Sequence, residues 1–162
     1  MKKLILPTIL ALAAVILVVA IFMLPKKTAF ERKNVDFTIV SRGDFSFAKD
    51  AGNTVIRTKE ALRNTWDTIY PPGASSPQLP DTDFSSNYYI AVFMGEKPTS
   101  GYSVDITSIQ EDENGYEVLI ESISPPNDGA TAQVMTQPYV LARIPATEKN
   151  ITFTVEKKEE SN

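Results

Sequence analysis

A long apolar run that ends in a glycine-rich turn limits how this chain can fold. Residues 88–94 are almost all apolar or aromatic, which is typical of a buried central strand. Residues 95–102 then contain two glycines, which permit positive φ, and Pro98, which cannot donate to a sheet. Alternation of apolar and polar residues resumes over residues 102–106. We therefore expect a loop held at both ends by strands, which is either a binding loop or a plain connection.

The remainder of the chain predicts further strands and one helix. Alternation indicates strands over residues 35–40, 54–57, 139–144 and 151–155. Thr58 is a good N-cap for a helix over residues 59–70, whose apolar face carries Leu62, Trp66 and Ile69. The expected fold class is α+β: an N-terminal transmembrane helix, then one domain with a mainly antiparallel sheet of about six strands and one packed helix.

A hairpin is predicted inside this sheet. Asn114-Gly115 is a strong signal for a two-residue turn, and it would pair Ile109 with Ile120. With that register the apolar residues before and after residues 107–108 fall on opposite faces. We therefore expect a bulge or a longer turn near residues 107–108.

An uncharged segment near the N-terminus predicts a membrane anchor. Residues 4–24 carry no charge and lie between lysines. At about 1.5 Å per residue, a helix of this length spans the roughly 30 Å hydrocarbon core of a bilayer. No small-residue cleavage site stands at its end, so we expect an uncleaved anchor in the lipid bilayer. Counting Lys and Arg alone would place the main domain in the cytoplasm, because more of them follow the segment than precede it.

These segments divide the chain into four parts. We expect a membrane anchor over residues 1–27 and a linker with an N-terminal strand over residues 28–53. The globular domain is expected over residues 54–156, followed by a charged tail over residues 157–162.

Composition excludes several functions. The chain has no cysteine and no histidine, so thiol nucleophiles, Ser-His-Asp triads, disulfides and the usual zinc ligands are absent. Residues 34–162 hold ten Lys/Arg against nineteen Asp/Glu, and this acidic balance disfavours nucleic acid as a partner. Lys97 and Ser100 stand in the reverse order of a Ser-x-x-Lys motif. We expect no enzyme activity, and no catalytic, cofactor-binding or metal-binding residue.

Four motifs in a fixed order carry a family resemblance. They are Asp83-Phe84, residues 90–93, residues 95–104 and Thr136-Gln137-Pro138-Tyr139. Residues 55–155 of the chain resemble the C-terminal domain of the PrcB family, although Ser100 stands where that family has a second glycine. The resemblance implies a non-catalytic module that binds and stabilises a surface protease. It also implies a single-pass cell-membrane protein whose domain lies outside the cytoplasm.

The motifs nominate a surface for binding another protein, with a protease as the implied partner. Two glycines and a proline set an unusual backbone, and tyrosines supply large contact area. The candidate residues are Gly95, Lys97, Pro98, Thr99, Gly101, Tyr102, Gln137, Pro138 and Tyr139.

A second resemblance gives an alternative function. Residues 97–102 and 137–139 are similar to the Asn-Pro-Thr-Thr-Gly-Tyr and Arg-Pro-Trp loops of chagasin-type inhibitors of papain-like cysteine peptidases. An inhibitor of this kind would use loops 95–102, 125–129 and 137–139 to enter the protease cleft. It would block turnover, whereas a complex subunit would leave turnover intact.

Overall fold

The structure is a computed structural model, and it describes residues 31–73, 76–126 and 131–160. These residues belong to one compact unit, Glu31–Asn162. Its elements, in chain order, are β1 (Lys33–Asn34), β2 (Thr38–Gly43), β3 (Ala51–Ile56), α2 (Lys59–Ile69), β4 (Asn87–Met94), β5 (Ser103–Glu111), β6 (Gly115–Ser124), β7 (Tyr139–Pro145) and β8 (Asn150–Glu159).

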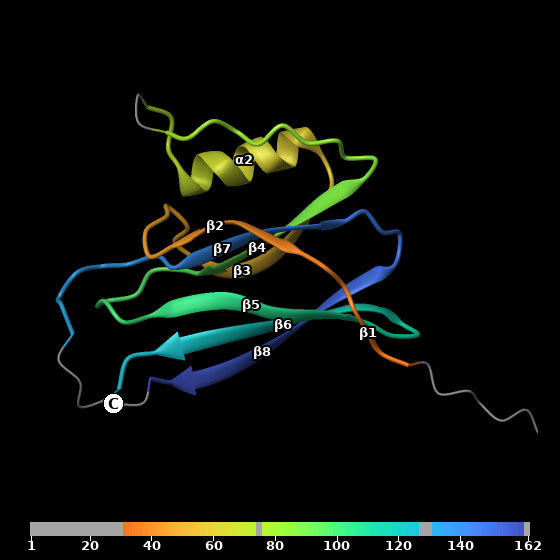
Figure 1. The fold of residues 1–162 in the computed structure, drawn as a ribbon. Helices are drawn as coiled ribbons and strands as arrows, with labels where there is room; N and C mark the ends of the chain where they lie inside the picture. Colours follow the sequence, from red (N-terminus) through yellow and green to blue (C-terminus); the bar gives the residue numbers. More distant parts are fainter. Residues whose placement is uncertain (1–30, 74–75, 127–130, 161–162) are drawn as a thin grey trace, which may run out of the picture. The chain divides into compact units, whose positions relative to one another are not determined.

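The strands form two sheets rather than one. One sheet has the order β1-β5-β6-β8 and the other the order β2-β7-β4-β3. Figure 1 shows the two sheets stacked, with α2 on the outer face of the β2-β7-β4-β3 sheet. Pairing is antiparallel except between β6 and β8, which are parallel. The unit therefore has three layers: helix, sheet and sheet.

The expected α+β class with a single sheet is wrong, because the described residues form mostly β-sheet with one short helix. Alternation along a strand reports one buried face, but it does not say whether a helix or a second sheet covers that face. Within the described residues, no helix is long and apolar enough to cross a membrane. The predicted span over residues 4–24 lies outside the residues that the structure describes.

The prediction of a central strand is confirmed by β4, which lies between β7 and β3. Ile90 and Val92 pack in the core between the two sheets, whereas Tyr89 and Ala91 pack in a second core under the helix. Both faces of β4 are therefore buried, which explains why its sequence is apolar without alternation.

The helix is confirmed with its predicted cap and face. The Thr58 hydroxyl accepts a hydrogen bond of 3.2 Å from the Ala61 N–H. Leu62, Trp66 and Ile69 are buried against the sheet. The indole N–H of Trp66 donates to the Pro77 carbonyl at 3.1 Å, so this buried ring leaves no polar atom unpaired.

The hairpin exists, but its predicted register is wrong by two residues. Ile109 pairs with Val118 instead of Ile120, so the turn is centred on residues 113–114. The Asp112 carboxylate accepts from the Asn114 and Gly115 N–H groups at 2.7 and 3.1 Å, which favours this earlier turn. The irregularity expected near residues 107–108 is confirmed, because the register shifts between Ile106 and Ser108.

Strands occupy parts of the chain that were expected to be a linker or a charged tail. β2 lies wholly within residues 28–53 and β3 begins there, and both belong to the same sheet as β4. β8 continues to Glu159 because it pairs with β6 as far as Ser124. Residues 157–159 are therefore part of a strand.

Candidate functional site

Two of the predicted binding segments lie side by side at one end of the compact unit (Figure 1). Lys97 and Thr136 form an antiparallel bridge, in which their N–H groups donate to each other's carbonyls at 2.8 and 3.0 Å. The Ser100 N–H donates to the Ala132 carbonyl at 3.0 Å. Residues 95–102 are thereby joined by backbone hydrogen bonds to the segment before Gln137.

A buried threonine and a glycine fix the shape of the 95–102 loop. Thr136 is 2% exposed, and its hydroxyl donates to the Thr99 carbonyl at 3.0 Å. Gly95 has φ of +69°, and a Cβ there would lie 2.7 Å from the Ala51 nitrogen. Gly101 has φ of +90°, so both loop glycines adopt the positive φ that glycine permits.

A third segment, residues 44–49, completes this end of the unit. The Gln137 N–H donates to the Asp44 carbonyl at 2.8 Å, and the Glu96 N–H donates to the Lys49 carbonyl at 3.0 Å. Ser46 is 4% exposed, and its hydroxyl donates to the Gln137 carbonyl at 2.9 Å. Residues 44–49, 95–102 and 132–138 therefore hold one another through their backbones.

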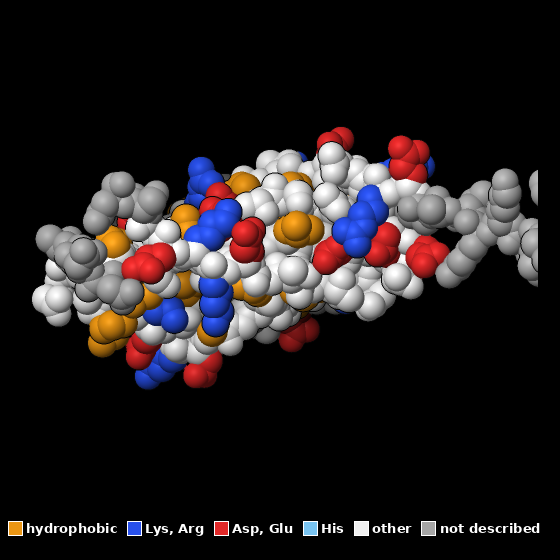
Figure 2. Space-filling view, turned by 90° about the horizontal axis from the view of Figure 1, so that it is seen from below, with side chains coloured by type: hydrophobic (Ala, Val, Ile, Leu, Met, Phe, Trp, Pro, Cys, Tyr) orange, Lys and Arg blue, Asp and Glu red, His pale blue; other side chains and the backbone are white. Residues whose placement is uncertain are grey.

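This loop cluster presents apolar side chains to solvent. Phe45 and Phe47 are 61% and 67% exposed, and Val134 and Met135 are 40% and 57% exposed. We call these four residues, together with the exposed Pro98, the loop surface. Figure 2 shows hydrophobic side chains at the end of the unit where these loops lie, whereas acidic and basic side chains are interspersed along the face in view.

The predicted site residues divide into exposed and buried groups. Pro98 and Gly101 are exposed, and Lys97, Thr99, Tyr102 and Gln137 are half-buried. The Lys97 ammonium lies 5.7 Å from the centre of the Tyr102 ring, within the range of a cation–π interaction. Gly95, Pro138 and Tyr139 are buried, so in this structure they pack inside the unit and are not part of its exposed surface.

Only the beginning of the 125–129 loop lies in the described residues. A Cβ on Gly101 would lie 2.8 Å from the Pro125 Cβ, so this loop starts against the 95–102 loop. Residues 127–130 lie outside the described residues.

Tyr139 belongs to a half-buried cluster of hydroxyl groups. Its hydroxyl lies 2.8 Å from the Ser41 hydroxyl and 3.1 Å from the Tyr70 hydroxyl, and Ser41 and Tyr70 are 2.6 Å apart. Burial raises the pKa of Tyr139 to about 12; the Ser41 hydrogen bond opposes this rise and Tyr70 adds to it. The cluster ties β2 and the end of α2 to β7, which is a structural role.

We predict that this cluster makes stability fall at high pH. The Tyr139 pKa is about 12 when folded and its ordinary value is 10.0, so the unfolded chain loses this proton first. Its contribution is complete below pH 10 and is lost as the pH rises towards 12, by about 1–3 kcal/mol. Tyr139→Phe should reduce this loss, as measured by urea unfolding at pH 9 and pH 11.5. An identical loss in both proteins would contradict the assignment.

Four residues of the loop surface, all except Pro98, were not predicted from the sequence. Phe45 and Phe47 alternate with Ser46 between Asp and Gly residues, and this pattern indicates an extended loop but not which side chains are exposed. Val134 and Met135 immediately precede the Thr136 motif. The available signal was the presence of large apolar residues inside segments predicted to be loops.

The described residues contain no group of three or more His, Cys, Asp or Glu side chains that could hold a metal ion. Their buried polar side chains are all hydrogen-bonded. The described residues form a two-sheet β-domain that presents an apolar loop surface at one end.

The family comparison agrees with the sequence motifs. Residues 88–145 match the model of the family described as PrcB C-terminal. This segment runs from β4 to β7 and contains both the 95–102 loop and the 136–139 motif. The family recognition is therefore confirmed for this part of the chain, which is less than half of its length. No curated protein and no solved structure matches the chain significantly.

Proposed function

We propose that this domain is a non-catalytic protein-binding module, that the loop surface is its contact, and that its partner is a protease. The observation that carries the proposal is the clustering of exposed apolar side chains. Among the described residues, five large hydrophobic side chains are exposed, and four of them belong to the loop surface. An exposed apolar patch of this kind is a common mark of a protein interaction site.

The rigidity of the loops supports this role. Backbone hydrogen bonds join the three segments, so the apolar side chains are presented from a preformed framework. Preformed loops lose less conformational entropy on binding than loops that must become ordered. Asp44, Lys49 and Glu96 are exposed in the same segments and provide polar groups beside the apolar ones, as protein interfaces do.

The position of Tyr139 favours a complex subunit over a chagasin-like inhibitor. In an inhibitor of that kind, Tyr139 would replace the aromatic residue of the Arg-Pro-Trp loop, which must reach into a protease cleft. Tyr139 is 4% exposed, and its hydroxyl is bonded inside the unit. The Tyr139 side chain could therefore enter a protease cleft only if the start of β7 left its packed position.

The test compares the full-length chain with a Phe45→Ser/Phe47→Ser variant. Both rings are mostly exposed, so their loss should leave thermal unfolding nearly unchanged. Each chain is crosslinked in source cells and its partners are identified by mass spectrometry. We expect the parent to capture a protease and the variant to capture at least tenfold less.

Arg63→Ser is the matched control, because it removes a large exposed side chain from α2. It should capture as much protease as the parent. Capture that is equal for all three chains, or no capture of a protease by the parent, would contradict the proposal. Protease activity measured on the complex should be undiminished, and its loss would instead support the inhibitor alternative.

A further inference from the structure

One sheet edge lacks the protection that the others have. In the β2-β7-β4-β3 sheet, β3 is an edge strand, and it pairs with β4 without any register shift. Its six residues, AGNTVI, include no charged residue and no proline, and the first four are exposed. A flat, uncharged edge strand presents free N–H and C=O groups to which another strand can bind.

The other described edges differ from β3. β1 has only two residues, and the register of β2 shifts between Ile39 and Ser41. β8 carries Lys and Glu residues over its last four positions. Short length, irregularity and charge are the usual means of preventing strand addition. Among the described strands, β3 is therefore the edge suited to accept one.

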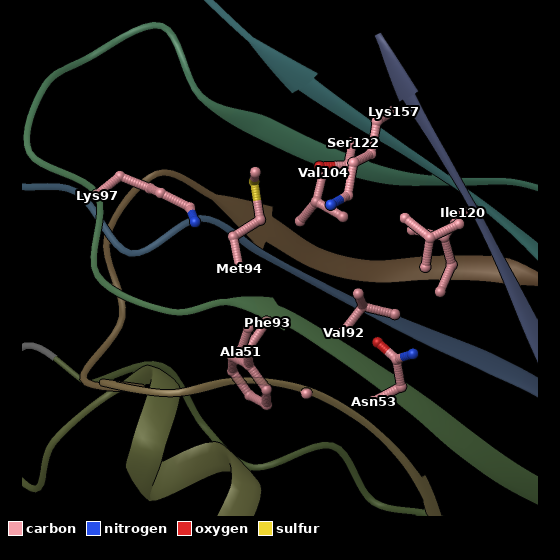
Figure 3. Close-up of a pocket in the computed structure, with 12 residues that line it drawn as sticks. Ala51, Asn53, Val92, Phe93, Met94, Lys97, Val104, Ile120, Ser122 and Lys157 are labelled. Carbon is pink, nitrogen blue, oxygen red and sulfur yellow. The ribbon is translucent and has the colours of Figure 1, made fainter.

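A pocket opens beside β3, between the two sheets. Its volume is about 340 Å³, and residues 51–53 of β3 form part of its wall. Val92, Met94, Val104 and Ile120 give it an apolar lining (Figure 3). Val155 of β8, the one exposed large hydrophobic residue of the described chain outside the loop surface, also lines it. An apolar side chain projecting from an added strand could be buried there.

Two lysines give this pocket a positive charge. Figure 3 shows the side chains of Lys97 and Lys157 directed from their backbones toward the middle of the pocket. Neither takes part in the ion pairs formed between described residues, and no acidic residue lines the pocket. Lys97 follows β4 just beyond the Ala51–Met94 pair, so it marks the end of the pocket where β3 begins. A carboxylate would complement this end.

We propose that β3 and this pocket bind the C-terminal segment of a partner protein. The segment adds to β3 as an antiparallel strand, which places its last residue beside Ala51. Its terminal carboxylate then lies between Lys97 and Lys157, and its last apolar side chain enters the pocket. Main-chain hydrogen bonds give affinity and the pocket gives specificity, as in other cases of strand addition. This contact is separate from the loop surface.

The test uses two hexapeptide libraries with randomised positions, one with free C-terminal carboxylates and one with C-terminal amides. Each is passed over the immobilised full-length chain. We expect the carboxylate library to be retained at least fivefold better, with apolar last residues enriched. Hydrogen exchange should show protection of residues 51–54 by a retained peptide. Equal retention of both libraries, or no retention of either, would overturn the proposal.

Substitutions on the strand edge and in the pocket show which groups bind the peptide. Lys97→Met/Lys157→Met should remove the preference for the carboxylate. Asn53→Glu should weaken binding, because it places a negative charge in the pocket wall and on the edge strand, where it repels the terminal carboxylate. Lys59→Met, on the exposed start of α2, should bind as the parent does. Phe45→Ser/Phe47→Ser should also retain peptide binding, so failure of the loop surface is distinguishable from failure here. Dodecanoate, a fatty acid with a carboxylate and an apolar tail, is tested as the alternative ligand of the pocket. If it binds and hydrogen exchange shows no protection of β3, the ligand is a lipid and the proposal is overturned.

Discussion

Trp66→Ala should lower the free energy of unfolding by about 3–5 kcal/mol, the usual range for truncation of a buried aromatic residue. Trp66 is 7% exposed and packs in the core between α2 and the β2-β7-β4-β3 sheet. Its ring centre lies 4.8 Å from that of Tyr70, and its N–H is bonded to Pro77. The substitution therefore leaves a cavity and an unpaired carbonyl. Urea unfolding monitored by circular dichroism measures the effect.

Arg63→Ala is the matched control for this prediction, because it shortens an exposed side chain on the same helix. It should change the free energy of unfolding by less than about 0.5 kcal/mol. If Trp66→Ala unfolds like the parent, the helix does not pack on the sheet through this face, and the second core is wrongly assigned.

Gly115→Ala should also destabilise the unit strongly, by about 2–4 kcal/mol. Gly115 has φ of +145°, and a Cβ there would lie 2.1 Å from the Asn150 carbonyl oxygen. Gly115 and Asn150 pair at the start of the parallel β6–β8 ladder, and the clash is with backbone, so its relief requires the two strands to separate. Thermal and urea unfolding measure the cost.

Gly52→Ala provides the control for a glycine substitution. Gly52 lies in β3, has no positive φ, and a Cβ there would meet nothing within 4 Å. This variant should match the parent or be slightly more stable, because alanine reduces the entropy of the unfolded chain. If both variants lose the same stability, the close approach of β8 to Gly115 is not the cause.

The elements that could be predicted from sequence are those whose signal is local. The apolar run of β4 is buried on both faces, and the Thr58 cap and the apolar face of α2 follow from spacing alone. The bulge near Thr107 could be inferred because apolar residues change faces there. In each case the pattern of a few neighbouring residues is enough to predict the element.

The assignments that failed depend on partners distant in sequence. A single sheet was expected because alternation gives a buried face without naming what covers it. The extension of β8 to Glu159 requires parallel pairing with β6, and no local pattern in a run of Lys and Glu indicates that pairing. The hairpin register is the exception, because it depends on a nearby side chain: Asp112 accepts hydrogen bonds from the N–H groups of the turn.

The candidate site was predicted only in part for the same reason. The motifs located the 95–102 and 137–139 segments, which the structure brings together through the Lys97–Thr136 bridge. They did not indicate that Tyr139 is buried or that Phe45 and Phe47 are exposed beside them. Burial of a residue in a loop is decided by tertiary packing, which the local sequence does not encode. The partner-binding role of the predicted residues stays a prediction.

Photo-crosslinking from the loop surface tests the proposed function directly, because it captures whichever protein touches that surface in the cell. A benzophenone amino acid is placed at Met135 of the full-length chain, and in a second chain at Arg63 on α2, both of which are exposed. After irradiation of source cells, we predict a crosslinked protein from position 135, identified as a protease by mass spectrometry, and none from position 63. Equal crosslinking from both positions, or none from position 135, would contradict the assignment of the loop surface as the binding site.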